Sequence, residues 1–461
     1  MRRELLIAAG PGEWRAALVE HGVAVELFVE RGDHGRAGAI YLGRVRRLLP
    51  ALGAALVEIG DDRPTFLPRR EIVPRGGRLD EGERVMVQIR REAHGGKAPQ
   101  ATMGITLRGK QSELRWGRPG LSGVEALSPE QSARLQAAAG TGASLLCDDR
   151  GAPGWGLKVL VPAPIDALVA EATALGERRQ GILGRASWVS PPARLDPQAT
   201  FAAELALALM ATPDRIVVDD PAAVPEIRST FPAAAVERRP ETEWPINLDS
   251  VFDQALSPSI ALGGGGLVHV EATRAATFID VDSGAPEAGS PERTGLAVNL
   301  SAVGAIARQI RLRALSGPIV IDFVGLDSRG PREQVRAALV GALALDPARP
   351  QILGWTRLGH FELVRPRRGR PLAETLLDPR AGGALAKSAV TVAYEALRAL
   401  RREARVQPGR SWRLTVAQDV ATALAGNAAT AVSALEDRFG RRIVIEADSR
   451  PDRERFDVAP A

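Results

Sequence analysis

The sequence predicts a multidomain protein of mixed α/β and α+β class. Its length of 461 residues exceeds one ordinary domain, since domains hold roughly 100–200 residues each. Residues 35–109 form a series of short strand-like runs separated by Gly, Pro and Asp, which is typical of a small barrel. After residue 113 helical and strand patterns follow one another, and the chain closes with a small α+β unit.

Composition favours a globular protein with a polyanionic partner. Hydrophobic residues make up 45% and charged residues 25% of the chain, as in ordinary globular proteins. The net charge is +5 and the pI about 9.9, which weakly favours nucleic acid. Arg far outnumbers Lys, and its planar fork suits phosphate oxygens. A biased genome would give the same excess of Arg, Ala, Gly and Pro.

Cysteine usage and the N-terminus bound the compartment. Cys147 is the single cysteine, so a disulfide within the chain and a thiolate zinc site are excluded. No run approaches the roughly 18 apolar residues of a membrane span, and the start of the chain lacks a signal-peptide pattern. We expect a cytoplasmic protein with no membrane contact.

Two strand-like runs, residues 4–8 and 23–29, open the chain. Two strands cannot bury a core by themselves, so they must pack on a later segment. Residues 113–212 contain three helical patterns, one capped near Ser128 and one beginning at Pro164. Residues 214–220 predict a buried strand and 246–256 a helix.

The predicted barrel carries basic residues and one aromatic residue, Phe66, expected near the same face. A basic groove with an aromatic platform binds single-stranded nucleic acid by charge and stacking. Alternatively, Phe66 belongs to the core and the arginines form a solvated surface, and the pattern leaves both open. The basic residues are Arg44, Arg46, Arg47, Arg69, Arg70, Arg90, Arg91 and Lys97.

The central signal lies in residues 263–326. Two apolar runs each contain a carboxylate, Asp280 in FIDVDSG and Asp322 in VIDF. A buried carboxylate is usually paired or bound to a metal, so we interpret the two as the ligands of one hard cation, with Asp282 beside them. Asp282 lies two residues from Asp280, hence on the same face of a strand. Salt-bridged or capping aspartates are the alternative.

Basic residues near this signal could contact phosphate. Arg308 and Arg311 lie near one face of the helical run ARQIRLRAL, which also holds Arg313. A later cluster, which a solvated turn would explain equally well, comprises Arg365, Arg367, Arg368 and Arg370. Residues 378–387 are interpreted as a Gly-rich linker and 388–461 as the small α+β unit.

The blocks IDVDSG, ARQIRLRAL and IVIDF, in this order and spacing, resemble the ribonuclease E/G family. The run from Gly38 through Ile72 resembles the family's OB-fold RNA-binding domain. The resemblance implies an RNase H-like part (1–34 and 213–258), an OB-fold (35–112) and a degenerate 5′-sensor-like region (113–212). It further implies a DNase I-like catalytic domain (259–377), a link (378–387) and a small C-terminal domain (388–461).

The resemblance also implies roles for individual residues. Asp280 and Asp322 match the family's two magnesium-binding aspartates, and Asp282 stands where the family usually has Asn. Phe66 and Lys97 match RNA-contacting positions of the OB-fold. The departures from the family are Leu56 for a second RNA-facing Phe, Arg274 for a Glu, Gly325 for an Asp, and Asp378 and Ala381 for the zinc-link cysteines.

The function expected from the resemblance is a Mg²⁺-dependent endoribonuclease without zinc at the link. It would cleave single-stranded RNA and leave 5′-phosphate and 3′-hydroxyl ends. The departures keep an alternative open, a weak or inactive RNA-binding protein on the same scaffold, and a phosphoesterase acting on DNA is a third reading. The 5′-monophosphate-reading pair is not recognisable. We expect a homodimer at most.

Overall fold

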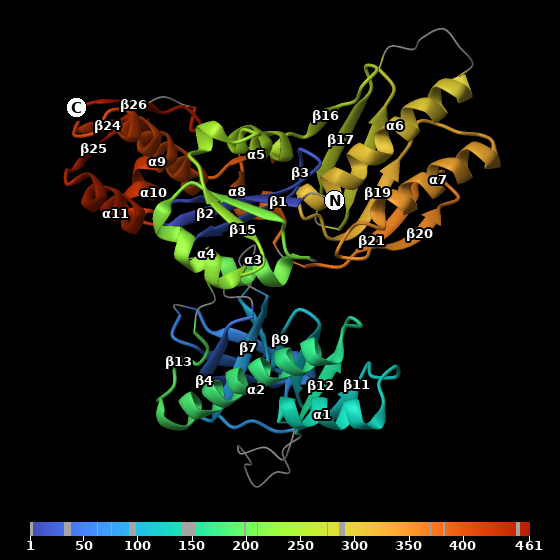
Figure 1. The fold of residues 1–461 in the computed structure, drawn as a ribbon, viewed down its shortest axis with the longest axis vertical. Coiled ribbons are helices and arrows are strands. Elements are labelled where there is room, and N and C mark those ends of the chain that lie inside the picture. Colours follow the sequence, from blue (N-terminus) through green and yellow to red (C-terminus); the bar gives the residue numbers. More distant parts are fainter. Residues whose placement is uncertain are drawn as a thin grey trace. The chain divides into compact units, whose positions relative to one another are not determined.

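A computed structural model describes residues 3–31, 38–61, 63–74, 76–91, 98–140, 154–197, 200–209, 211–273, 275–284, 291–368, 370–380, 383–448 and 452–461. The chain divides into two compact units (Figure 1), Met1–Asp33 with Phe201–Ala461, and His34–Thr200. Both combine helices and sheets, which confirms the predicted multidomain α/β class.

The unit His34–Thr200 contains the predicted barrel. Strand β7 pairs with both β8 and β4, and this pairing closes a five-stranded barrel of OB-like type. Side chains at alternate positions, such as Val57, Leu67 and Val87, fill it. The strands are β4 (Ile40–Leu49), β5 (Ala54–Glu58), β6 (Thr65–Pro68), β7 (Arg84–Arg91) and β8 (Gln100–Thr102), with β13 (Ala193–Arg194) added beside β4.

A second sheet and two helices complete this unit. Helix α1 (Pro129–Ala139) begins at Ser128, whose side chain accepts from the N–H of Gln131 in a capping box, and ends at Gly140. Helix α2 (Ile165–Trp188) follows Pro164, so both predicted helix starts are confirmed. The sheet runs β11 (Gly120–Ser122), β12 (Trp155–Val159), β10 (Ser112–Trp116), β9 (Thr106–Arg108).

In the other unit, the N-terminal strands find the later partner that the sequence required. Strand β1 pairs in parallel with β14, register Leu5 with Ile216. Alternate β1 side chains enter separate cores, Leu5 against α3 and α4, and Leu6 against α5. The strands are β15 (Ala235–Arg238), β14 (Arg215–Val218), β1 (Arg3–Ala9), β2 (Glu13–Glu20) and β3 (Val23–Arg31), and the helices are α3 (Phe201–Ala208), α4 (Val224–Thr230) and α5 (Leu248–Leu256).

The end of the chain forms an α+β unit as predicted, but the predicted linker is a hairpin. Strands β22 (Leu377–Pro379) and β23 (Leu385–Lys387) pair antiparallel. They connect α8 (Leu372–Leu376) to the long helix α9 (Ala389–Val406). The remaining elements are β24 (Trp412–Ala417), α10 (Gln418–Ala425), α11 (Ala429–Phe439), β25 (Ile443–Asp448) and β26 (Asp457–Pro460).

Helix α9 is joined to the N-terminal sheet by buried ion pairs. Glu13 on β2 is 4% exposed; it accepts from Arg31 Nε at 2.7 Å and also pairs with Arg398 on α9. Burial alone would raise the pKa of Glu13, but the surrounding guanidinium groups outweigh burial and lower it below the usual value. One turn later, Arg401 pairs with the buried Asp219 and donates to the carbonyl of Ala9 at 2.6 Å.

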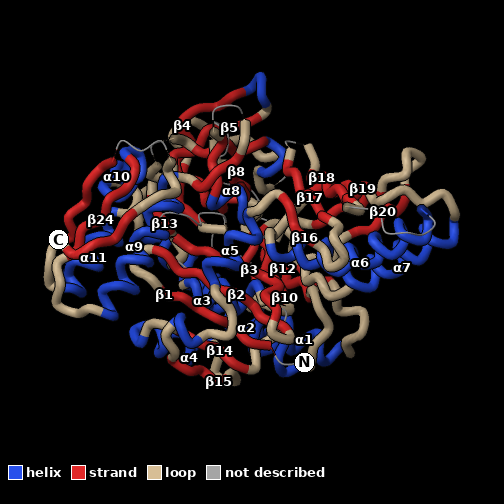
Figure 2. The backbone as a smooth tube through the Cα atoms, turned by 90° about the horizontal axis from the view of Figure 1, so that it is seen from above, coloured by secondary structure: helices blue, strands red, loops and turns tan. Residues whose placement is uncertain are grey.

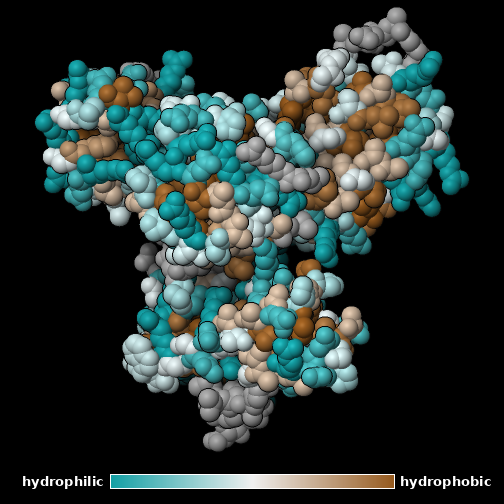
Figure 3. Space-filling view, viewed as in Figure 1, coloured by the Kyte–Doolittle hydropathy of each residue, from teal (hydrophilic) through white to brown (hydrophobic). Residues whose placement is uncertain are grey.

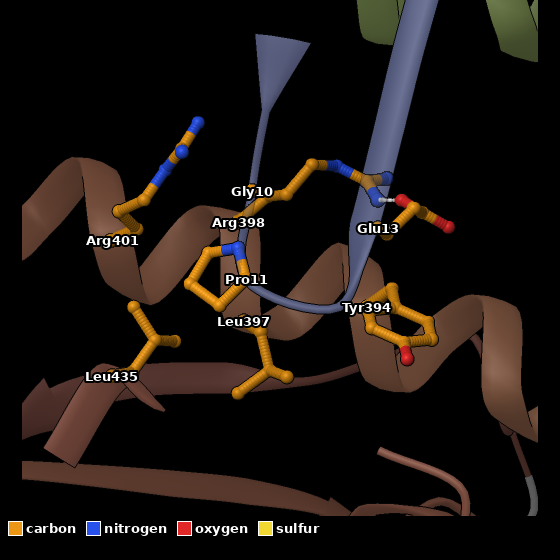
Figure 4. A pocket seen from close by; sticks show the side chains of 8 residues that line it. All are labelled: Gly10, Pro11, Glu13, Tyr394, Leu397, Arg398, Arg401 and Leu435. Carbon is orange, nitrogen blue, oxygen red and sulfur yellow. Dashed lines mark hydrogen bonds and ion pairs between the residues drawn. The ribbon is translucent and has the colours of Figure 1, made fainter. Parts of the chain in front are cut away.

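The turn between β1 and β2 lies against α9 and borders a small pocket (Figure 4). Gly12 has φ +72, and a Cβ there would lie 2.8 Å from the Cβ of Ala431, so glycine is required on both counts. Figure 4 shows Tyr394, Leu397 and Arg398 on the helix that borders the turn. The pocket is thus a gap in the packing of the N-terminal hairpin on α9, far along the chain from the aspartates of the FIDVD motif.

Candidate metal and nucleic-acid sites

The FIDVD and VIDF motifs lie on a six-stranded sheet that is covered on one face. Helices α6 (Pro291–Leu312) and α7 (Arg329–Leu343) lie on the same side of these strands (Figure 2) and pack on residues such as Ile279 and Ile321. Apolar atoms remain visible over these helices (Figure 3), and Leu300 and Val340 are exposed there. The sheet order is β16 (Ser259–Ala261), β17 (Leu267–Ala272), β18 (Thr277–Asp282), β19 (Gly317–Asp322), β21 (Phe361–Arg365) and β20 (Gln351–Trp355).

Asp280 and Asp322 are direct partners on parallel neighbouring strands. The register of β18 and β19 places Asp280 beside Asp322, so their Cα atoms are about 4.8 Å apart, one strand spacing. Both point to the face opposite the helices, because Ile279 and Ile321 beside them are buried. The expected convergence of the two carboxylates is therefore present in the backbone.

The two aspartates are not buried, contrary to the prediction from the sequence. Both carboxylates are exposed, and 60% of the Asp322 side chain is accessible. Apolar and acidic residues alternate along these strands. Only the apolar residues face the core that the helices cover. Burial therefore does not require a cation between the aspartates, and the case for a metal rests on their register and their oxygen donors.

The surrounding groups define the chemistry of this face. Asp282 shares it, but its carboxylate accepts from the N–H of Gly284 at 2.9 Å in a turn after β18. His269 lies beside Asp280 on β17, and His360 Nε2 lies 3.7 Å from Asp322 Oδ2. Neither histidine was singled out from the sequence, because they stand 11 and 38 residues from the aspartates, outside the motifs.

The two aspartates fit a hard divalent ion. Mg²⁺ is typically held by one or two carboxylates and keeps several waters, and two exposed carboxylates one strand apart leave room for them. Across the described part of the chain, no three His, Cys, Asp or Glu side chains converge closely enough to hold an ion as they stand. The site therefore offers two carboxylates, and water, substrate or side chains that rotate toward the ion would fill its other positions.

The exposed face of this sheet is acidic and carries one large aromatic residue. Phe278 is 47% exposed and lies two residues before Asp280 on the same face. Strand residues sharing this face by register include the carboxylates of Glu271, Asp280, Asp282, Asp322 and Glu362. Such a face repels a phosphate unless a cation intervenes. The alternation in FIDVD already placed Phe278 beside the aspartates and could have identified it.

Two of the arginines expected to contact RNA face the interior instead. Arg311 is 9% exposed and donates to Glu26 at 2.6 Å, while Arg308 Nε donates to the carbonyl of Ala24 at 2.8 Å. Both fix α6 to β3. Burial lowers the pKa of Arg308. Their guanidinium groups are taken up inside the chain, which leaves them little room for phosphate.

The later arginine cluster divides between interior and surface. Arg365 is 5% exposed, forks Asp346 at 2.6 and 3.0 Å and donates to the carbonyl of Leu315. It is a buried structural residue. Arg368 is exposed and donates to the carbonyl of Ala208 at 3.2 Å. Arg313, in the earlier run ARQIRLRAL, does not belong to this cluster. Burial lowers its pKa to about 10.

The barrel presents a second candidate surface. Arg47, Leu56, Phe66 and Gln100 pair in sequence across β4, β5, β6 and β8, so they form one row on one face. Phe66 is half-buried, so its exposure does not decide whether the ring belongs to the core or to a stacking platform. Arg44 is exposed and donates to the carbonyl of Gly82 at 3.0 Å.

Four residues named from the sequence lie outside the described residues: Lys97, Cys147, Arg274 and Ala381. Asp378 is described and lies on β22.

Within the described part of the chain, the helices include none with the length and apolarity to cross a membrane.

Comparison with known proteins points to one family. A model of the ribonuclease E/G family matches residues 163–368. Ribonuclease E of Nostoc sp. is 32% identical over 399 residues, covering 80% of this chain and 57% of the relative. Ribonuclease E of Synechocystis sp. is 31% identical over 383 residues, covering 77% and 55%. Ribonuclease G of Escherichia coli K12 is 27% identical over 499 residues, covering 99% of both chains.

The chain therefore spans little more than half of the two ribonuclease E relatives and nearly all of the ribonuclease G relative. The range that the family model matches, residues 163–368, contains both Asp280 and Asp322. The one cysteine of this chain, Cys147, cannot supply the cysteine pair of a zinc link. The chain belongs to the ribonuclease E/G family, as a member of ribonuclease G-like size without the zinc-link cysteines.

Proposed function

We propose that this protein is a divalent-ion-dependent endoribonuclease that cleaves single-stranded RNA during RNA processing or decay. The observation that carries the proposal is the pairing of Asp280 with Asp322 on an exposed sheet face. Relatives that carry the names ribonuclease E and ribonuclease G support the reaction class. The cation we propose is Mg²⁺, the products carry 5′-phosphate and 3′-hydroxyl ends, and the protein acts in the cytoplasm.

Each side chain of the site has a proposed role. Asp280 and Asp322 would hold the ion, which supplies Lewis acidity toward the scissile phosphate when bound. Asp282 is anchored to Gly284 and would add negative charge beside the ion, which strengthens the binding of a cation. Phe278 would stack on a base next to the cleaved linkage, because its exposed ring shares the face of both aspartates. The acidic strand residues would make cleavage depend strictly on a cation.

The barrel would hold the RNA strand. Phe66 and Arg47 share one row, and the exposed Arg44 lies on the same strand as Arg47. Stacking by Phe66 and phosphate contact by these arginines would bind single strands without strong sequence preference. Arg368 and Lys97 remain proposed contacts. We further propose that the first sheet is RNase H-like and that residues 259–377 are DNase I-like.

The decisive experiment compares wild type with Asp280→Asn and Asp322→Asn on a fluorogenic single-stranded RNA in Mg²⁺. Asp437→Asn, an exposed aspartate on α11, is the matched control. We expect cleavage by wild type and control and none by the two site variants. Equal inertness of all four proteins, with tight RNA binding retained, would instead establish the non-catalytic RNA-binding alternative.

Two further measurements bound the proposal. Competition between matched RNA and DNA oligomers should favour RNA, and preference for DNA would assign a different phosphoesterase. The affinity for RNA should fall with salt, since each phosphate contact releases counterions. A flat response would exclude phosphate binding by the arginine surface.

We propose a homodimer at most, held by packing alone. Light scattering should therefore give one mass with and without a zinc chelator.

A further inference from the structure

The proposed ion site is flanked on both sides by imidazoles. Across four neighbouring strands the register aligns His269 on β17 with Asp280 on β18, and Asp280 with Asp322 on β19. Since Ile321 pairs with Phe361, the next position pairs Asp322 with His360. Residues paired across strands point to one face. The exposed face therefore carries the transverse row His269–Asp280–Asp322–His360.

The geometry of Asp322 and His360 suits two ligands of one ion. Their facing atoms are 3.7 Å apart, which is longer than a hydrogen bond of about 2.7–3.2 Å. Two ligands each about 2.1 Å from one ion, and about 90–120° apart around it, lie about 3.0–3.6 Å from each other. The observed separation needs an adjustment of only a few tenths of an ångström. Asp280, one strand away, supplies the third donor by side-chain rotation.

Supporting contacts hold both histidines in place. His269 Nδ1 lies 2.8 Å from Ser259 Oγ, and a proton on Nδ1 donated to Ser259 leaves the lone pair on Nε2 for an ion. Metal-binding histidines commonly have their second nitrogen engaged in this way. The backbone of His360 is fixed by two hydrogen bonds with Thr356, of 2.8 and 3.2 Å.

Donor type decides which ions such a row prefers. Mg²⁺ takes oxygen ligands, whereas imidazole favours first-row transition-metal ions. We propose that the row His269–Asp280–Asp322–His360 is a mixed carboxylate–imidazole site that binds first-row divalent ions more tightly than Mg²⁺, with His360 as the deciding ligand. This inference rests on the proposed function, because it assigns the same ion site. Mg²⁺ can still serve the reaction where it is far more abundant.

Metal binding tests this directly and without reference to cleavage. Co²⁺ and Mg²⁺ are titrated into the full-length protein by calorimetry, and the visible absorption of Co²⁺ reports nitrogen ligation. We expect Co²⁺ to bind more tightly than Mg²⁺. His360→Gln should weaken Co²⁺ by roughly tenfold or more, since a direct ligand should matter at least as much as an outer-sphere partner. Mg²⁺ affinity should change little.

Controls separate this inference from the proposed function. His21→Asn removes an exposed imidazole from a turn elsewhere in the same unit and should leave both affinities unchanged. Ser259→Ala should weaken Co²⁺ by about tenfold through His269. If Asp322→Asn abolishes ion binding while His360→Gln leaves the Co²⁺/Mg²⁺ ratio as in wild type, the histidine inference is overturned and the aspartate site stands. If wild type binds neither ion, both proposals fail.

Discussion

Removing the charge of Glu13 tests whether buried ion pairs hold the N-terminal sheet to α9. Glu13→Gln keeps the shape of the side chain but leaves Arg31 and Arg398 beside a neutral amide. Removing one partner of a buried ion pair costs about 3–5 kcal/mol. Asp249 also pairs with Arg398, at 3.6 Å, and compensates in part. We therefore expect the lower end, a loss of about 3 kcal/mol in the free energy of unfolding.

Urea unfolding followed by circular dichroism gives this free energy by linear extrapolation. Hydrogen exchange of peptides from β2 and α9 assigns the transition to this unit of the chain. The control is Glu333→Gln, which removes an exposed i,i+3 ion pair with Arg336 and should cost less than about 0.5 kcal/mol. A loss below about 1 kcal/mol for Glu13→Gln would refute the reasoning.

The stability of wild type and that of Glu13→Gln should depend differently on pH. The pKa of Glu13 is lowered in the folded protein from an ordinary value of 4.5. The carboxylate therefore contributes stability that is complete above about pH 4.5 and is lost as the pH falls through the lowered pKa. Wild type should lose more stability than Glu13→Gln on acidification below this pH. Equal slopes of stability against pH would show that Glu13 does not carry this contribution.

Three further substitutions separate structural from binding roles. Arg365→Met should destabilise the protein by about 3 kcal/mol in urea unfolding, because it leaves Asp346 buried and unpaired, whereas Arg367→Met at an exposed pair should be near neutral; the reverse order would place Arg365 on the surface. Phe278→Ala should weaken binding of a single-stranded RNA by about 1–3 kcal/mol in a fluorescence-anisotropy titration, and unchanged affinity would remove its stacking role. Leu56→Phe should tighten that binding, since Leu56 pairs with Phe66, and no gain would favour the core reading of Phe66.

Local pattern was sufficient for the parts of the site that lie on one strand or in one register. Alternation in FIDVD sets Phe278, Asp280 and Asp282 on one face, and the parallel pairing of β18 with β19 brings in Asp322. The regular turns of residues 35–109 likewise indicated a small barrel, closed or partly open, and the pairing of β4 with β7 shows that it is closed. The prediction that the aspartates are buried was wrong, because the sequence does not show that helices cover only one face of the sheet.

Contacts between distant segments explain what the sequence could not give. Helical periodicity groups Arg308 with Arg311, but Glu26, which binds Arg311, lies 285 residues away. Arg365 looks like part of a basic surface cluster until Asp346 is seen beside it. His360 reaches Asp322 only through the pairing of β21 with β19. In each case a side chain's role depends on a partner that no local pattern identifies.

The parallel pairing of β1 with β14 has a consequence for the order of synthesis on the ribosome. Strand β1 ends at Ala9 and β14 begins at Arg215, so at about 5–20 residues per second the first strand waits roughly 10–40 s for its neighbour. The whole unit His34–Thr200 is translated in that interval. Meanwhile one edge of the nascent N-terminal hairpin has unpaired N–H and C=O groups. Until β14 emerges, this edge can therefore pair with strands of other chains.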